Sequence, residues 1–125
     1  MNKDYMENEE EMQNKGMDTE ESVDGVYKFV KPIDVDGETL KQVSYNFDGI
    51  KPIQYINLVK RAEKQKGTVS VPELDMDIQI GLFSLASGLP VTAIKNVNSL
   101  KDLNRICRLS RDFLLDGSGD ANEQE

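Results

Sequence analysis

The sequence contains no histidine and no tryptophan, a single cysteine and few aromatic side chains. Without histidine, the usual general base, the usual zinc ligand and the usual near-neutral pH switch are all missing. Cys107 cannot form an intrachain disulfide, and its place on the apolar side of a predicted helix indicates a buried, unreactive thiol. No apolar run approaches the ~20 residues that span a bilayer, and the acidic N-terminus is unlike a secretory signal. We therefore expect a soluble cytoplasmic protein that does not enter a membrane.

Residue patterns of catalytic and metal sites are missing as well. Asp75 and Asp77 lie two positions apart in a predicted helix, so their carboxylates would point to different sides. Asp34, Asp36 and Glu38 lack the spacing of a calcium-binding loop. No serine or cysteine can pair with a histidine for nucleophilic catalysis. The sequence thus favours a protein that is not an enzyme and binds no cofactor or metal.

The net charge of −8 is unevenly distributed along the 125 residues. Residues 1–25 hold nine acids and two lysines, and residues 116–125 hold four acids and no base. The middle, residues 26–115, holds 13 bases and 10 acids, a net charge of +3. High charge and low hydrophobicity predict two disordered acidic tails around a single domain of residues 26–115. Alternatively, the N-terminal tail shields a basic partner surface or folds back on the chain's own bases.

Residues 26–47 have the alternation of a β-hairpin centred on Asp36 and Gly37. A two-residue loop would place the odd-numbered apolar residues of the two strands on opposite faces. A three-residue loop of residues 35–37, with Gly37 left-handed at a bulge, would place them on one face. We therefore predict the longer loop. The residues brought together would be Tyr27, Phe29, Ile33, Val43, Tyr45 and Phe47.

Residues 74–89 form the most apolar predicted helix, with clear start and stop signals. Ser70 and Glu73 have the spacing of a capping box, Gly88 suits a left-handed C-terminus, and Pro90 prevents continuation. The main apolar stripe comprises Leu74, Ile78, Leu82, Leu85 and Ala86. Because apolar residues occur on nearly all sides, the helix is either the centre of the core or covered on one side by another protein.

Two more helices and a short helical turn complete the predicted fold. The first helix runs from Pro52 to about Gln65, with basic residues at its C-terminal end. Residues 91–97 suit a short helical turn. The last helix spans residues 99–116 and is capped by Asn98 or Ser99. Its predicted apolar side comprises Leu100, Leu103, Ile106, Cys107, Ser110, Phe113 and Leu114. The predicted fold class is α+β, an N-terminal β-hairpin packed on a small bundle of three main helices plus a short helical turn.

Three segments of this pattern resemble the tail assembly chaperones of long-tailed bacteriophages, the Mu-type tail assembly protein family. They are K-P-I-x-V-D-G-E at residues 31–38, S-G-L-P at 87–90, and S-L-K-D-L-x-x-I at 99–106, followed by F-L-L at 113–115. The resemblance covers about residues 27–115 and rests on structural positions rather than catalytic ones. Residues 45–52 depart from the family's L-R-x-P-T-x-x-D-L helix start.

The resemblance implies a small non-catalytic chaperone in the host cytoplasm. Such proteins bind the long, aggregation-prone tape measure protein while tail tube subunits assemble around it. The tape measure protein is therefore the expected partner, with the tail tube protein as a second. The resemblance also implies that the protein is not retained in the mature virion.

Apolar side chains beside the main helical stripes are the candidates for partner binding. Ile80 and Phe83 in the central helix and Leu109 in the last helix would form a groove for a partner helix. Self-association into a homo-oligomer could hide such a groove in the absence of the partner. Arg105, Arg108 and Arg111, three residues apart on the opposite side of the last helix, could receive an acidic partner.

Two other functions remain open. One is a small nucleic-acid-binding regulator that uses the bases of two helices, Lys60, Arg61, Lys64, Arg105, Arg108 and Arg111. The net charge makes nucleic acid a disfavoured partner. The other is a structural component of the phage tail.

Overall fold

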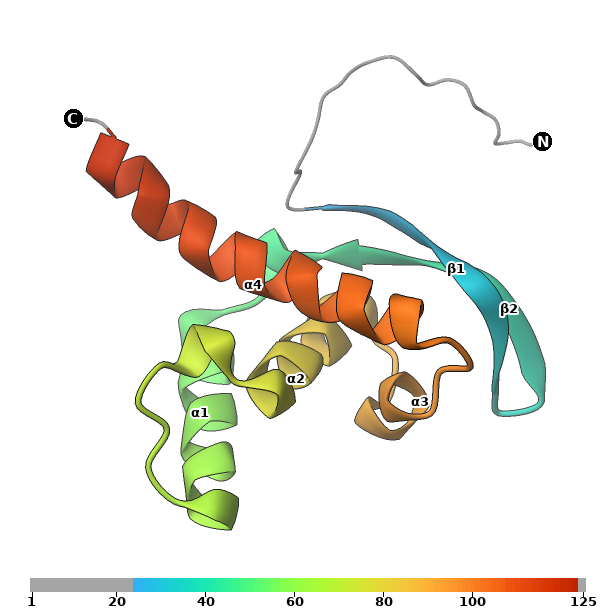
Figure 1. Cartoon of the computed structure of the whole chain (residues 1–125), viewed down its shortest axis with the longest axis horizontal. Helices are drawn as coiled ribbons and strands as arrows, with labels where there is room; N and C mark the ends of the chain where they lie inside the picture. The colour runs from blue at the N-terminus through green and yellow to red at the C-terminus, as the bar shows by residue number, and fades with distance from the viewer. Residues whose placement is uncertain (1–23, 124–125) are drawn as a thin grey trace.

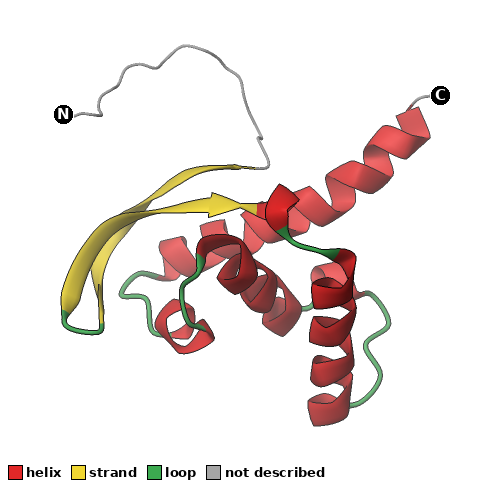
Figure 2. Ribbon diagram, turned by 180° about the vertical axis from the view of Figure 1, so that it is seen from behind, coloured by secondary structure: helices red, strands yellow, loops and turns green. Residues whose placement is uncertain are grey.

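A computed structural model of the chain describes residues 24–123 and has an α+β arrangement, as the sequence predicts (Figure 1). An antiparallel two-stranded sheet lies beside a group of helices, and the last helix crosses the molecule (Figures 1 and 2). The elements in order are β1 (Asp24–Val35), β2 (Glu38–Asn46), the 3₁₀ turn η2 (Phe47–Gly49), α1 (Pro52–Lys66), the 3₁₀ turn η3 (Pro72–Leu74), α2 (Met76–Ser87), α3 (Val91–Lys95) and α4 (Leu100–Glu123).

The hairpin loop differs from the prediction. Val35 pairs directly with Glu38, so the loop contains two residues rather than three. Asp36 and Gly37 both have positive φ, 53° and 82°, which is the backbone of a type I′ turn. Gly37 is left-handed as predicted, but no bulge follows it. The two-residue loop is favoured over the three-residue loop because the twist of a type I′ turn matches the twist of the strands.

A change of register within β1, rather than a longer loop, brings the odd-numbered apolar residues of the two strands to one face. The register is regular from Asp24 to Lys28, and it is shifted where pairing resumes at Ile33. Tyr27 therefore pairs with Val43 on the core side, whereas Ile33 pairs with Leu40. The predicted shared face of Tyr27, Phe29, Ile33, Val43, Tyr45 and Phe47 is thus found, although its cause is an irregularity around Pro32, which cannot donate a ladder hydrogen bond.

The start of α2 also differs from the prediction. Ser70 does not cap it. Asp75 is the N-cap, and its Oδ1 accepts the amide of Ile78 at 3.1 Å. Pro72 to Leu74 form the separate turn η3. Gly88 ends α2 with φ 84°, the left-handed C-terminus that the sequence predicts.

α2 is the centre of the core. It contacts α1, α3, α4, β2 and both 3₁₀ turns, and its residues 78–83 are all buried. Gln79 and Ser110 join α2 to α4, because the Ser110 hydroxyl donates to the Gln79 carbonyl at 2.8 Å. The predicted stripe is wrong at two positions, since Leu74 and Leu85 are exposed. Periodicity identifies an apolar helix, but it cannot locate the neighbours of a helix that is apolar on nearly every side.

α4 buries Ile106, Cys107 and Ser110 against the core, as predicted. Burial raises the pKa of the Cys107 thiol. Leu100 was predicted on the apolar side and is exposed instead. The helix also continues to Glu123 rather than ending near Asp116, although Gly117 and Gly119 have low helix propensity.

The predicted N-terminal tail is shorter than expected at its inner end. Asp24 and Gly25 belong to β1, where they pair with Asn46 and Tyr45. Residues 1–23, the rest of that predicted tail, lie outside the described residues, as do residues 124 and 125 of the predicted C-terminal tail.

Candidate functional site

A buried carboxylate joins the hairpin to α4. Asp102, in the first turn of α4, is 0% exposed. Its Oδ1 accepts the amide of Val30 at 2.8 Å and the hydroxyl of Tyr27, and its Oδ2 accepts the amide of Lys31 at 3.1 Å. The irregular part of β1 leaves these amides without strand partners, so Asp102 takes the place of the missing ladder. The sequence could have indicated that Asp102 is buried, because it lies four residues before Ile106 and eight before Ser110, on the buried side of the helix.

The environment of Asp102 affects the ionisation of Tyr27. Burial, together with the hydrogen bond and the charge of Asp102, raises the pKa of Tyr27 to about 12. The Arg105 charge lies near enough to the Tyr27 hydroxyl to oppose this rise. A second contact supports the same junction, since the Asn98 amide donates to the Pro32 carbonyl at 2.8 Å. These groups hold β1 and α4 in fixed relation, which is a structural role.

Two of the predicted partner-binding residues are in the core and not at a surface. Ile80 is 3% exposed and Phe83 is 0% exposed. The Phe83 ring lies 5.6 Å from the Tyr45 ring and 6.2 Å from the Phe47 ring, measured between centroids. The Phe47 ring in turn stacks on Phe113 of α4. The hairpin and α4 together cover the side of α2 that was expected to receive a partner.

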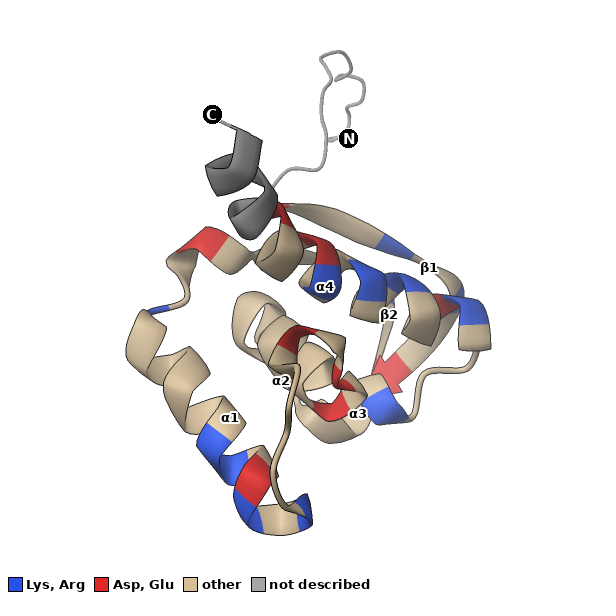
Figure 3. Cartoon of the chain, turned by 60° about the vertical axis from the view of Figure 1, so that its left-hand side comes forward, with Lys and Arg blue, Asp and Glu red and all other residues tan. Residues whose placement is uncertain are grey.

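The other predicted partner-binding residues lie together on α4. Arg105 and Arg108 are exposed, Arg111 is half-exposed, and Leu109 is half-buried against the core. The exposed Lys101 precedes them on the same side of the helix. We call Lys101, Arg105, Arg108 and Arg111 the basic stripe. In Figure 3, basic positions recur along α4, and another lies on the neighbouring strand β1.

A second candidate surface is a small groove bounded by α1, α2 and α3. Its volume is about 220 Å³, and its apolar lining comes from Leu58 and Ala62 of α1, Gly81 of α2 and Val91 of α3. Gly81 lets α1 approach α2 closely, because a Cβ at this position would overlap Leu58 Cδ1. A drug-sized ligand needs roughly 300 Å³ or more, so this groove suits one large side chain instead.

The rim of the groove is charged. Arg61, Asp77 and Lys95 border it. Asp77 is bound by Lys66 at 2.8 Å and by Lys95 at 3.6 Å, and the hydrogen bond from Lys66 lowers the pKa of Asp77. Arg61 is exposed and takes part in no ion pair among the described residues. An acidic residue beside an apolar anchor would therefore meet a cation here.

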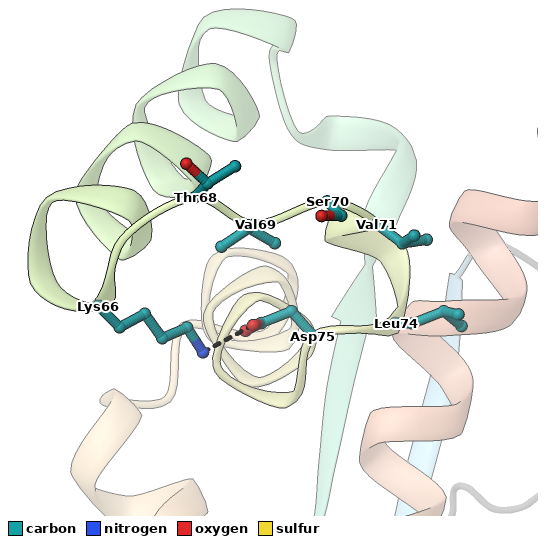
Figure 4. Close-up of a pocket in the computed structure, with 7 residues that line it drawn as sticks. All are labelled: Lys66, Thr68, Val69, Ser70, Val71, Leu74 and Asp75. Carbon is teal, nitrogen blue, oxygen red and sulfur yellow. Dashed lines mark ion pairs between the residues drawn. The ribbon is translucent and has the colours of Figure 1, made fainter.

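A shallow hollow lies between the end of α1 and the start of α2 (Figure 4). Lys66 crosses it to bind Asp75 at 2.6 Å, and the pKa of Lys66 is raised by its hydrogen bonds to Asp75 and Asp77. Val69 points toward α2, whereas Val71 and Leu74 are exposed at 45% and 59%. Because Lys66 and Asp75 bind each other across the hollow, we assign this feature to the α1–α2 junction rather than to ligand binding.

Sequence reasoning missed the groove because its lining combines residues from three elements. Leu58 and Ala62 read as ordinary core positions, and Gly81 reads as a weak point in a helix. Within residues 24–123, no group of three or more acidic or cysteine side chains could hold a metal ion. No described helix is both long and apolar enough to cross a bilayer. No protein-family model matches the chain, and the comparisons with curated proteins and with solved structures found no match.

Proposed function

We propose that this chain is a non-catalytic assembly chaperone of a long-tailed bacteriophage. In this role it binds the tape measure protein in the host cytoplasm and keeps it soluble while tail tube subunits assemble around it. The nature of the partner comes from the sequence resemblance over residues 27–115. The structural observation that carries the proposal is the groove above Gly81, with its apolar floor and its charged rim, on which Arg61 is exposed.

The groove replaces Ile80 and Phe83 as the proposed binding site. A helix of the tape measure protein would insert one large apolar side chain between Leu58 of α1 and Val91 of α3. Such a buried anchor gives most of the affinity in many interfaces. An acidic residue one turn away on the partner helix would contact Arg61, which has no ion-pair partner among the described residues.

A substitution at the groove tests the proposal. Val91 lines the groove and is 37% exposed, so Val91→Asp adds a carboxylate without removing a core residue. Thr92→Asp is the matched control, because Thr92 is the next residue of α3, is exposed and does not line the groove. We expect Val91→Asp to weaken capture of co-expressed tape measure protein by about tenfold, or about 1.4 kcal/mol. Thr92→Asp should leave capture unchanged, and both variants should melt like the unaltered protein.

Equal capture by the two variants would remove the groove as the binding site. The role itself is tested separately with purified phage particles. A chaperone is absent from them, whereas a stoichiometric amount in mature particles would contradict the proposal and identify a structural tail component.

A further inference from the structure

The basic stripe of α4 carries more positive charge than its surroundings neutralise. Arg111 pairs with Asp112 at 3.2 Å, while Lys101, Arg105 and Arg108 join no ion pair within the described residues. Asp102 is buried and binds Tyr27, Val30 and Lys31, and Arg105 is the member of the stripe that lies near this cluster. Bases three and four residues apart on one side of a helix repel one another. The stripe is therefore a surface to which an acidic segment would bind favourably.

We propose that residues 1–23 of this chain bind the basic stripe. This segment holds eight acids and two lysines, a charge of −6, which complements the four bases of the stripe. Three of its acids, Glu9, Glu10 and Glu11, are consecutive. The inference is independent of the proposed chaperone function.

The position at which this segment joins the domain favours the contact. β1 begins at Asp24, and its residues Tyr27, Val30 and Lys31 are bound to Asp102 at the start of α4. At its own start, however, β1 pairs Asp24 with Asn46, and the adjacent Phe47 stacks on Phe113, so the N-terminal segment enters the domain beside the later part of α4, near the Arg111 end of the stripe. The exposed Lys31, next to Asp102, adds a further base at the opposite end of the stripe.

The length of the segment is sufficient. Its 23 residues span at most about 75 Å when extended, whereas the rise of α4 from Lys101 to Arg111 is about 15 Å. Because both parts belong to one chain, the effective concentration is on the order of millimolar, so individually weak charge contacts suffice. The same tether gives the segment an advantage over a separate polyanion, which the net charge of −8 also repels.

An acidic partner, or the phosphates of a nucleic acid, would compete with residues 1–23 for Arg105 and Arg108.

Carbodiimide crosslinking of the full chain provides a direct test. The reagent joins a carboxyl group to a lysine amine only when the two are in contact, and Lys101 and Lys31 report on the stripe. Lys60 and Lys64 of α1 are equally exposed controls on another element. We expect residues 9–11 to link mainly to Lys101 and Lys31, with yields that fall severalfold at about 0.5 M NaCl because salt screens exposed charges. Mixing isotopically light and heavy protein separates links within a chain from links between chains.

Charge reversal supplies the second readout. The Arg105→Glu/Arg108→Glu variant should lose the links to Lys101 severalfold, whereas the Lys60→Glu/Lys64→Glu variant should keep them. Because Arg105 lies near Tyr27, Arg108→Glu/Arg111→Glu replaces the first pair if thermal melting shows that the first pair is unfolded. Links distributed evenly over all four lysines, links only between chains, or links unchanged by charge reversal would each overturn the proposal.

A labelled single-stranded oligonucleotide tests the competing occupant. If residues 1–23 occupy the stripe, the full chain should bind the oligonucleotide no better than nonspecific binding, with a Kd of about 100 µM or weaker at physiological salt. Binding much tighter than this, lost on charge reversal at Arg105 and Arg108, would overturn the proposal and assign the stripe to nucleic acid.

Discussion

Asp102 of α4 accepts the backbone amide of Val30 in β1 at 2.8 Å, across 72 residues of sequence. With the Tyr27 hydroxyl and the Lys31 amide, this carboxylate receives three donors in a site closed to solvent. A side chain from the last helix thus completes the hydrogen bonding of the first strand.

Replacement of Asp102 should strongly destabilise the protein. Asp102→Asn keeps the size of the side chain but directs an NH₂ group at backbone amides that are themselves donors. We expect a loss of about 3 kcal/mol in the free energy of unfolding, as for other broken buried charge networks. Asp112→Asn is the control, because Asp112 is exposed on the same helix and its pairing with Arg111 is worth little. Urea titration of both variants gives the comparison, and equal midpoints would contradict the structural role of Asp102.

Tyr27 should make stability depend on pH in the alkaline range. Its hydroxyl has an ordinary pKa of 10.0, raised in the folded protein to about 12. Its stabilising contribution is therefore complete below pH 10 and is lost as the pH rises from 10 to 12. Tyr27→Phe should remove this component.

The pH experiment must be read as a difference between two proteins. Hydrogen bonds to Asp75 and Asp77 raise the pKa of Lys66, and burial raises the pKa of Tyr55, so both groups also titrate at high pH. Subtracting the unfolding free energies of Tyr27→Phe from those of the unaltered protein at each pH isolates Tyr27. A difference that stays constant from pH 9 to 12 would show that Tyr27 is not responsible.

Gly81 and Leu58 should be energetically coupled. Alanine is favoured over glycine by about 1 kcal/mol in a helix, but a Cβ at position 81 would overlap Leu58 Cδ1. We expect overpacking to prevail, so Gly81→Ala should destabilise by about 1 kcal/mol net. In Leu58→Ala the space is open, and Gly81→Ala should then be neutral or stabilising. A double-mutant cycle measures the coupling, and strict additivity would exclude the close contact.

The turn of the hairpin should tolerate one substitution and resist another. Gly37 has φ 82°, where a β-branched residue is strained, so Gly37→Val should destabilise by about 1 kcal/mol or more. Asp36→Asn should be nearly neutral, because asparagine also accepts the positive φ of Asp36. Thermal melting monitored by circular dichroism distinguishes the two. An unaffected Gly37→Val variant would mean that the turn has another backbone conformation in solution.

The sequence was sufficient to predict the elements but not the details that join them. The left-handed conformations of Gly88 and Gly37 were predicted correctly, because a glycine at a helix end shortly before a proline, or in a tight turn, has few alternatives. The start of α2 was misplaced from Asp75 to Ser70, since both residues are good caps and only the turn η3 selects between them. The shared face of the hairpin's apolar residues was predicted correctly but attributed to the loop instead of to the irregularity in β1. An irregularity in the middle of a strand has no strong local signal in the sequence apart from Pro32.

The candidate site was less predictable than the fold. Ile80 and Phe83 were expected at a surface because the hairpin and the other helices were thought too few to cover every side of α2. In the structure, the ring of Phe83 meets aromatic residues of β2 and η2, which the sequence does not reveal as neighbours. The basic stripe was visible from its three-residue spacing, since exposure on one helix needs only local information. The groove over Gly81 needed three elements at once and could be found only in the structure.

The bond from Val30 to Asp102 also has a consequence for the order of synthesis. The hairpin leaves the ribosome well before α4 exists, so the amides of Val30 and Lys31 initially have only water as a partner. The amides of this part of β1 lack their protein acceptor until the first turn of α4 is made. Contacts between residues so far apart in the sequence form slowly. A nascent chain that is interrupted before residue 102 therefore lacks the acceptor that closes β1, whatever the quality of the hairpin itself. Synthesis of the first turn of α4, rather than formation of the hairpin, therefore supplies the contact that closes β1.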